Sequence, residues 1–126
     1  MRLEKPNKYL SEIKSLYETA FPEDERCEFN YLLNGRYSNY QMFALIKENK
    51  FIGFIYIAFY KNIAYINYFA IKEEFRSCGY GSKALRLLKE MCQDFNIILS
   101  IEKPMSGLQK RRLKFYQVND FFLYRI

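Results

Sequence analysis

The sequence contains no histidine and no tryptophan, and it has only three prolines and three cysteines among 126 residues. Without histidine, catalysis by a Ser-His-Asp or Cys-His arrangement is excluded. A zinc site is disfavoured for the same reason, and we expect no metal cofactor. The cysteines, Cys27, Cys78 and Cys92, are odd in number and lack metal-ligand spacing, which favours a reducing cytosol over a disulfide-bonded secreted fold.

Long apolar runs are also absent. No stretch approaches the roughly 20 apolar residues that a membrane helix needs, and no signal-peptide pattern opens the chain. We therefore expect a cytoplasmic protein without a membrane partner. The length of 126 residues suits one domain, residues 1–126, around a single core. Twelve Tyr and twelve Phe predict that aromatic rings build much of that core.

Acidic residues are fewer than basic ones, 14 against 20, and the formal net charge is +6. Such a balance raises the question of a nucleic-acid partner, because phosphate contacts dominate that kind of binding. The basic residues are dispersed, apart from a group on one expected helix: Lys110, Arg111, Arg112 and Lys114. A solvated helix face accounts for this group, and net charge bears on association rather than on one partner, so nucleic acid is disfavoured.

Apolar periodicity divides the chain into helices and strands. Helices are expected at residues 7–20, with Asn7 as a candidate cap, and at 29–33, with Asn34 and Gly35 as a stop. An antiparallel meander is expected at 41–48, 51–60 and 63–71, with a weaker strand signal at 2–4. A helix from residue 82 leads to a strand at 96–101, which this crossover makes parallel to 63–71. A helix at 108–119 and a strand beginning at 121–126 complete an α+β fold.

The segment between the strand 63–71 and the helix from residue 82 carries the clearest motif. It reads Arg76-Ser77-Cys78-Gly79-Tyr80-Gly81, with two glycines just before the helix. Glycine adopts positive φ and lets the backbone approach a ligand closely. The start of a helix offers unpaired N–H groups and the positive end of the helix dipole. Together these features predict an anion site, most naturally for a pyrophosphate.

The pattern Arg76-x-x-Gly79-x-Gly81 resembles the acyl-CoA pyrophosphate loop of the GNAT superfamily of N-acetyltransferases. The order of elements is similar to that family's over nearly the whole chain. The resemblance implies a three-layer α/β/α sandwich whose mixed sheet has an antiparallel N-terminal meander and a parallel pair of fourth and fifth strands. Two departures are visible: the family commonly has Asn-Gly-Phe where this sequence has Asn119-Asp120-Phe121, and the family's final strand is missing.

Two other interpretations of the glycines remain open. Gly79-x-Gly81-x-x-Ala84 also satisfies the dinucleotide fingerprint, with Glu102 near the place of its ribose-binding acid. However, seven residues separate Ile71 from Gly79 and only 45 follow Gly81, which leaves too little room for a doubly wound sheet. The third interpretation is a glycine-rich turn that only joins strand to helix.

The resemblance implies that acetyl-CoA is the cosubstrate and that an acetyl group passes directly to a primary amine in a ternary complex. Backbone groups of the strand end would pair with the pantetheine arm and polarise the thioester carbonyl, and amides of the loop would hold the pyrophosphate. The expected acyl-CoA-binding residues are Phe69, Ala70, Ile71, Arg76, Ser77, Cys78, Gly79, Tyr80, Gly81 and Ser82. The acceptor would be a small molecule or a peptide amine.

Two catalytic candidates follow. The segment with Phe115, Tyr116 and Phe121 resembles the family's Phe-Tyr-x-x-x-Gly-Phe, in which the tyrosine often protonates the CoA sulfur; the alternative is a core tyrosine. Glu102 could act as a base through water, because Tyr65 stands where some members have a glutamate; the alternative is a solvated carboxylate. Cys78 is expected to be a bystander.

Further expectations concern the partners. The acidic loop could attract a cationic acceptor through Glu23, Asp24, Glu25 and Glu28, although surface acids are usually just solvated. A homodimer could cover the strand edge at 96–101, or the terminal strand could instead pair with that edge directly. We therefore predict a cytosolic N-acetyltransferase of bacterial type, with a non-catalytic acyl-CoA-binding or interaction module on the same scaffold as the alternative.

Overall fold

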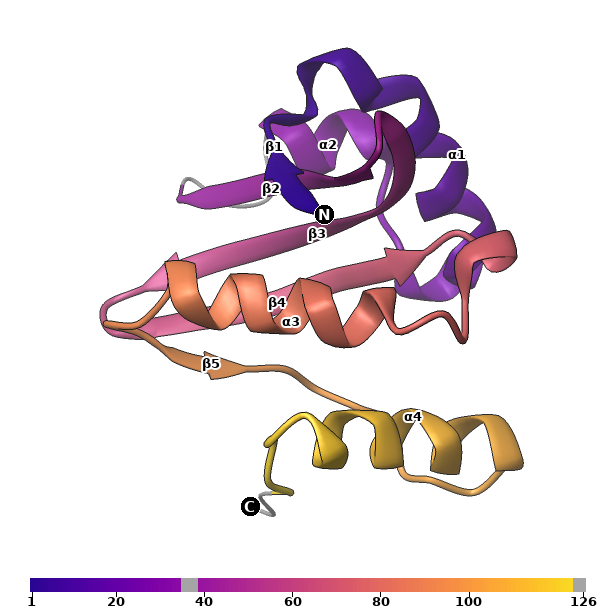
Figure 1. Cartoon of the computed structure of the whole chain (residues 1–126), viewed down its shortest axis with the longest axis vertical. Coiled ribbons are helices and arrows are strands. Elements are labelled where there is room, and N and C mark those ends of the chain that lie inside the picture. Colours follow the sequence, from indigo (N-terminus) through magenta and orange to yellow (C-terminus); the bar gives the residue numbers. More distant parts are fainter. Residues whose placement is uncertain (35–38, 124–126) are drawn as a thin grey trace.

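A computed structural model describes residues 1–34 and 39–123 (Figure 1). Its helices and strands, in chain order, are β1 (Arg2–Glu4), α1 (Leu10–Ala20), α2 (Phe29–Asn34), β2 (Tyr40–Lys47), β3 (Lys50–Tyr60), β4 (Ile63–Ile71), α3 (Tyr80–Met91), β5 (Asn96–Ile98) and α4 (Gly107–Val118). Three short 3-10 turns, η1 (Pro6–Tyr9), η2 (Glu23–Glu25) and η3 (Glu73–Phe75), lie between them.

The strands form one sheet in the order β1-β2-β3-β4-β5. The first four pair antiparallel, and β4 pairs parallel with β5 across the crossover helix α3. The tight turn between β2 and β3 is made by Glu48 and Asn49, whose φ angles of 51° and 64° suit the right-handed twist of a two-residue hairpin. The expected α+β class, the meander and the parallel pair are confirmed.

Two helical layers enclose the sheet, as Figure 1 shows. α1 and α2 cover one face, and the core there is rich in rings, with Tyr17, Tyr56 and Tyr68 among its members. α3 covers the other face, where Leu85 and Leu88 pack on aliphatic side chains of β3 and β4. β3 is buried on both faces for most of its length, which explains its nearly continuous apolar sequence. The three-layer sandwich is confirmed, with the aromatic part of the core on one side.

α4 lies beyond β5, past the edge of the sheet (Figure 1). None of its residues is fully buried, but Phe115 and Tyr116 pack against the α3-side core. The helix begins at a capping box: the Ser106 side chain accepts from the Gln109 N–H, and the Gln109 side chain accepts from the Ser106 N–H. A helix that is mostly exposed therefore has a well-defined start and a small apolar contact.

Several expected boundaries are wrong. Asn7 caps no helix, because Pro6 opens the tighter turn η1 and α1 begins only at Leu10. The strand expected at 96–101 ends at Ile98, where the ladder with β4 stops. Residues 121–123 form no strand, since the ring of Phe121 packs back on Tyr116 instead of extending beside β5. Gly35 and residues 124–126 lie outside the described residues.

Among residues 1–34 and 39–123, the search for membrane-spanning helices found none that is long and apolar enough to cross a bilayer.

Candidate functional site

The sheet opens between β4 and β5. Their parallel ladder holds three pairs, the last being Tyr65 with Ile98, while β4 continues to Ile71. Within that continuation the register of β3 and β4 shifts, so Asn67 is an extra residue opposite the Tyr56–Ile57 step. Such a bulge bends a strand and increases its twist. The C-terminal half of β4 therefore has no β5 partner, and the region beside it, between the end of the ladder and the glycine loop, is called the gap below.

Backbone groups of β4 face this gap at alternate residues. The N–H of Lys72 donates to the Ile52 carbonyl at 2.8 Å, so the N–H and C=O of Ile71 point away from β3. By the same alternation those of Phe69 point toward the gap, whereas those of Ala70 point toward β3. The Ile71 carbonyl accepts a hydrogen bond from Arg76 Nε at 3.0 Å. That bond ties the loop to the strand end and leaves the amides of Phe69 and Ile71 on the open side.

The glycine loop has the backbone of an anion-binding nest. Ser77 and Gly79 both have positive φ, 63° and 82°, and Gly79 is the N-cap of α3. The first helical bond runs from the Lys83 N–H to the Gly79 carbonyl at 3.2 Å. No side chain of residues 1–34 or 39–123 caps this helix start, so the amides of its first turn, from Tyr80 to Ser82, are available to an anion. A Cβ on Gly79 would meet nothing within 4 Å, so glycine is needed there for its conformation and not for space.

Gly81 serves a different purpose. A Cβ built on it would lie 2.9 Å from Cζ of Phe115 and 3.9 Å from Cζ of Phe69. The rings of Phe69 and Phe115 are 6.5 Å apart, so the first turn of α3, the end of β4 and α4 meet at this point. The missing side chain lets α4 pack directly on the start of α3. Gly81 thus couples the anion loop to the helix that carries Tyr116.

Tyr116 is fixed by the motif that ends α4. Its carbonyl accepts from the Phe121 N–H at 3.0 Å, and the Gln117 carbonyl accepts from the Asp120 N–H at 3.2 Å. Asp120 has a φ of 68°, and the rings of Tyr116 and Phe121 meet edge-on at 5.6 Å. These are the bonds and the apolar contact of a Schellman motif. Asp120 thus occupies the left-handed position of the turn in which the family commonly has glycine.

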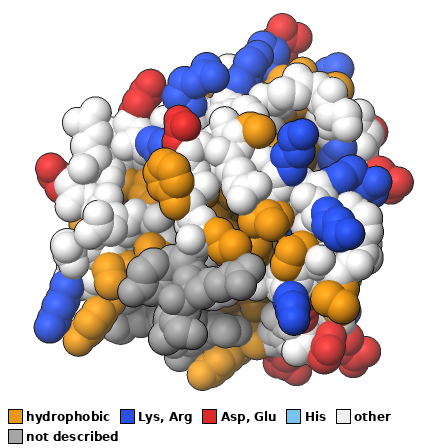
Figure 2. Space-filling model, turned by 90° about the horizontal axis from the view of Figure 1, so that it is seen from below, with side chains coloured by type: hydrophobic (Ala, Val, Ile, Leu, Met, Phe, Trp, Pro, Cys, Tyr) orange, Lys and Arg blue, Asp and Glu red, His pale blue; other side chains and the backbone are white. Residues whose placement is uncertain are grey.

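The surroundings of Tyr116 suit a proton donor. Burial raises the pKa of its hydroxyl to about 12, and the nearby charge of Arg112 offsets part of that rise. The hydroxyl therefore keeps its proton throughout the physiological range. Tyr116 also lines a groove of about 890 Å³ between β5, α4 and the segment after α4, together with Tyr65, Ile97, Leu99 and Leu113. Figure 2, which views the molecule from below, shows hydrophobic side chains gathered near the middle of that face.

Glu102 is paired with a second carboxyl group. Its side chain makes a hydrogen bond with Glu25, from η2, and accepts another from Gln109 Nε2 at 2.6 Å. The bond to Glu102 raises the pKa of Glu25, whereas the bonds from Glu25 and Gln109 lower the pKa of Glu102. Of the two carboxyl groups, Glu102 is therefore the one whose ionised form is favoured. The hydroxyl of Tyr68, in β4, donates to the Glu25 carbonyl at 3.0 Å and joins the η2 turn to the sheet.

One face of α4 connects the two catalytic candidates. Gln109, Arg112 and Tyr116 recur at intervals of three and four residues, which places them on one side of the helix. The positive charge of Arg112 acts to lower the pKa of each of these three groups, Tyr116, Glu25 and Glu102, although other effects raise the first two overall. The carboxyl pair and the tyrosine therefore flank a common cation, although they come from three separate segments.

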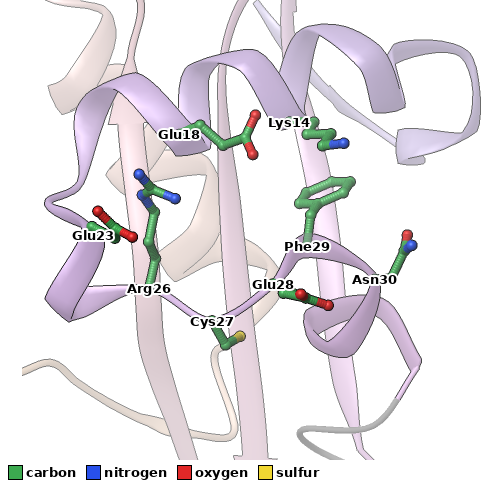
Figure 3. A pocket seen from close by; sticks show the side chains of 8 residues that line it. All are labelled: Lys14, Glu18, Glu23, Arg26, Cys27, Glu28, Phe29 and Asn30. Carbon is green, nitrogen blue, oxygen red and sulfur yellow. The ribbon is translucent and has the colours of Figure 1, made fainter.

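The rest of the acidic loop lies elsewhere. Glu23 and Glu28 line a second cavity of about 440 Å³ between α1, η2 and the start of α2 (Figure 3). Lys14, from α1, and Arg26, from the loop, line the same cavity, and Arg26 Nε donates to the Phe21 carbonyl at 3.1 Å. Basic and acidic side chains thus share that cavity. Of the expected acceptor-attracting acids, Glu25 is the one that meets Glu102.

The three cysteines are free thiols, and Cys27 lines the same cavity as Arg26. Cys78 is exposed, and its Sγ donates toward the Arg76 carbonyl at 3.5 Å. Cys92 is buried on the α3 side, and burial raises the pKa of its thiol. In the part of the chain that the structure describes, no three Cys, Asp or Glu side chains come together as metal ligands.

Sequence reasoning missed several residues of this site. The pattern Ser106-x-x-Gln109 is the sequence signal of a capping box. It could have drawn attention to Gln109, whose side chain also donates a hydrogen bond to Glu102. Ser100, whose Oγ accepts from the Tyr65 hydroxyl at 2.8 Å, gave no signal. Neither did the pairing of Glu25 with Glu102, because nothing local brings together two acids so far apart in the sequence.

The comparisons with known proteins agree with this arrangement. The family model described as the acetyltransferase (GNAT) family matches residues 10–121. The chain belongs to the GNAT acetyltransferase family. Among solved structures, a protein from Bacteroides thetaiotaomicron assigned to the GNAT family superposes with a TM-score of 0.89 at 26% identity, covering 100% of this chain and 74% of that one. No curated protein matches the sequence significantly.

More distant GNAT-like structures share the fold. A Pyrococcus furiosus protein assigned as an acetyl transferase has a TM-score of 0.73 at 21% identity, covering 99% of this chain and 95% of that one. AAC(6')-Iy, solved with the bisubstrate analogue CoA-S-monomethyl-acetylneamine, has a TM-score of 0.67 at 14% identity, with coverage of 99% and 95%. Both likenesses extend over almost the whole of each chain.

Proposed function

We propose that this GNAT protein is an acetyl-CoA-dependent N-acetyltransferase that moves an acetyl group directly to a primary amine. The proposal rests on one observation above all: the uncapped amides at the start of α3 lie beside the free half of β4, and Gly81 joins them to the helix of Tyr116. Family membership supports acetyl transfer in general. The amine acceptor is our inference from the chemistry of the site.

Acetyl-CoA would be held along the gap. The amides from Arg76 to Ser82 would bind the pyrophosphate, and the backbone groups of Phe69 and Ile71 that face the gap would pair with the pantetheine arm. An amide at the strand end would polarise the thioester carbonyl; such preorganised donors are worth about 10²–10³ in rate. The Arg76 side chain would hold the loop against β4 while the ligand binds.

The reaction needs two bond changes, formation of the C–N bond and cleavage of the C–S bond, and two proton transfers. An ammonium acceptor first loses a proton to become the neutral amine, and its nitrogen then attacks the thioester carbonyl carbon. The C–S bond breaks, the departing thiolate takes the proton of the Tyr116 hydroxyl, and solvent returns a proton to Tyr116. Glu102 would receive the proton of the amine through water, since its lowered pKa keeps it ionised. The high pKa of Tyr116 suits this role, because it keeps a proton on the hydroxyl until the thiolate forms.

The carboxyl pair favours a cationic acceptor. Glu25 and Glu102 would attract an ammonium group to the side of the gap where the acceptor must enter, and Arg112 would limit how much negative charge builds up. A neighbour of the same fold, AAC(6')-Iy, is solved with the bisubstrate analogue CoA-S-monomethyl-acetylneamine, which supports an amine acceptor for this chain as well. The three free cysteines suit a reducing cytosol.

A non-catalytic acyl-CoA binder remains the second candidate, and one observation favours it. Tyr65, in the place where some members have a catalytic glutamate, is bound to Ser100, and Glu102 is already occupied by Glu25 and Gln109. The two candidates share ligand binding and differ in turnover.

A screen of amines with acetyl-CoA, followed as free thiol, separates them. The panel should contain aminoglycosides, polyamines, peptide N-termini and lysine peptides. The proposed function predicts thiol release that depends on at least one amine. Thiol release no faster than acetyl-CoA hydrolysis in buffer, with every amine, would establish the binding module.

Association through the β5 side is a further proposal. Ile98 and Leu123 are half exposed there, beside the apolar groove and the free edge of β5. Light scattering at micromolar concentration would show a homodimer if this face is covered by a second copy, and a monomer would reject the proposal.

A further inference from the structure

A lysine of α3 reaches the turn that ends α4. The Lys89 ammonium donates a hydrogen bond to the carbonyl of Asn119 and lies 4.8 Å from the centre of the Phe121 ring. Asn119 is the C-cap of α4, and its side-chain amide donates to the Phe115 carbonyl at 2.8 Å. A cation is favourable at the C-terminal end of a helix, where carbonyls lack partners. Lys89 therefore binds the turn through both a carbonyl and an aromatic face.

This turn is one that needs external support. Asp120 occupies the left-handed position of the Schellman motif, with a φ of 68°. For residues other than glycine that conformation is strained, less for Asp than for most. The turn cannot rely on glycine at this position. The contacts of Lys89 offset part of the cost from the neighbouring helix.

The ring that Lys89 covers is the one that contacts Tyr116. Phe121 lies edge-on to Tyr116 at 5.6 Å, and its N–H is bonded to the Tyr116 carbonyl. Phe115 also contacts the Tyr116 ring, with 5.2 Å between the ring centres. The direction of the Tyr116 ring is thus set by two phenylalanines, one held by Gly81 and the other by Lys89.

We propose that Lys89 is a positioning residue for Tyr116: it locks the turn at Asn119, Asp120 and Phe121 so that the phenol is held in one direction. The catalytic part of this proposal rests on the proposed function, in which Tyr116 protonates the thiolate. The structural part does not, because it concerns the environment of one ring. The two parts can therefore be tested separately.

The first test follows the Tyr116 ring without any ligand. Tyrosines carrying ¹³C at Cζ are observed by NMR in the full chain, and the Tyr116 signal is assigned by its loss in Tyr116→Phe. Lys89→Met keeps the aliphatic stem but removes the cation and the donor. It should shift or broaden the Tyr116 signal, whereas Lys89→Arg should restore it. Arg86→Met, one turn earlier on the exposed side of α3, removes the same charge and should leave the signal unchanged.

Asp120→Gly supplies a second variant that separates positioning from general destabilisation. With glycine at the left-handed position, the turn no longer depends on outside contacts. Lys89→Met should then disturb the Tyr116 signal much less in the Asp120→Gly chain than in the parent. A Tyr116 signal that Lys89→Met leaves in place, or a disturbance just as large in the Asp120→Gly chain, would overturn the proposal.

The second test is turnover with the acceptor from the amine screen. Lys89→Met should lower kcat by about 10- to 10²-fold, with the KM for acetyl-CoA unchanged, because small misplacements of a reacting group have effects of this size. In Tyr116→Phe, Lys89→Met should cause no further loss. If Lys89→Met lowers kcat by the same factor in the parent and in Tyr116→Phe, Lys89 does not act through the Tyr116 hydroxyl. If Tyr116→Phe alone retains full kcat, the proton-donor role fails, while the NMR result still decides the role of Lys89.

Discussion

The Cα of Gly81 lies against the ring of Phe115, so close that a Cβ there would stand 2.9 Å from Cζ. This contact joins the anion loop of α3 to α4 one residue before Tyr116. The second glycine of the motif thus has a packing role in addition to the access it gives to the backbone. The loop and the candidate acid are linked through the packing of the protein itself.

Gly81→Ala should lower the free energy of unfolding by about 1–3 kcal/mol, since an added methyl group in a close contact strains its surroundings. Phe115→Leu in the same chain should recover most of this loss by clearing the space. Gly81→Val should fold but no longer gain melting temperature with CoA. Urea unfolding of the single and double variants measures the effect, and a double variant no more stable than Gly81→Ala would reject the Phe115 contact as its cause.

A substitution at Gly79 tests the effect of backbone conformation alone, because an added side chain there meets no neighbouring atom. Gly79→Ala should cost roughly 1–2 kcal/mol, because an alanine must adopt a φ near 82° although nothing obstructs its side chain. Relaxation of that strain would spoil the nest, so the shift in melting temperature with CoA should shrink. Gly107→Ala is the matched control: its Cβ also meets nothing, and its φ is not positive. Equal effects of the two substitutions would contradict the nest.

Tyr116→Phe should lower kcat by about 10²–10⁴ with little change in CoA affinity. The folded pKa of about 12 exceeds the ordinary value of 10.0, so the stabilisation from burying the neutral phenol is complete below pH 10 and lost as the pH rises through 12. Titration of Tyr116 should therefore cause no fall in kcat between pH 7 and 10. A pH–rate profile with an alkaline fall in that range, absent from Tyr116→Phe, would contradict the pKa and hence the buried donor.

Glu25→Gln should raise the KM for a cationic amine and leave that for acetyl-CoA unchanged. The raised pKa of Glu25 gives stability that is complete below its unfolded pKa and is lost as the pH rises through the folded value. Glu102 is the opposite case, with stability lost as the pH falls through its lowered pKa. The amine KM should rise as acid protonates the pair. Glu12→Gln, on exposed α1, is the control, and equal KM changes in both variants would remove Glu25 from the acceptor side.

The elements around the glycine loop could be predicted because their signals are local. The predicted strand 63–71 has the observed bounds, Ile63–Ile71. Gly79 marks the start of α3, but the helix begins at Tyr80 and not at residue 82, so Gly81 lies in its first turn. The parallel pair with β5 followed from the crossover helix. Both loop glycines were expected to allow positive φ or a close approach; Gly79 has positive φ, whereas Gly81 does not.

The parts that could not be predicted depend on contacts between distant segments. The aromatic and apolar residues at 121–123 favour a strand, but the Schellman turn and Lys89 hold the ring of Phe121 against Tyr116. The pair of Glu25 and Glu102 forms because β4 positions the η2 turn through Tyr68. The packing role of Gly81 becomes visible only once α4 is placed. Local propensity carries none of these three relationships.

The most direct test of the central claim follows the acetyl group itself. Acetyl-CoA labelled with ¹³C at the acetyl carbonyl is incubated with the protein and the amine identified by the screen, and products are analysed by NMR and mass spectrometry. The proposed function predicts one labelled amide on the amine for each thiol released, no label on the protein at any time, and much slower transfer by Tyr116→Phe. Label on Cys78, or thiol released with the acetyl group found only as acetate, would contradict direct transfer to an amine.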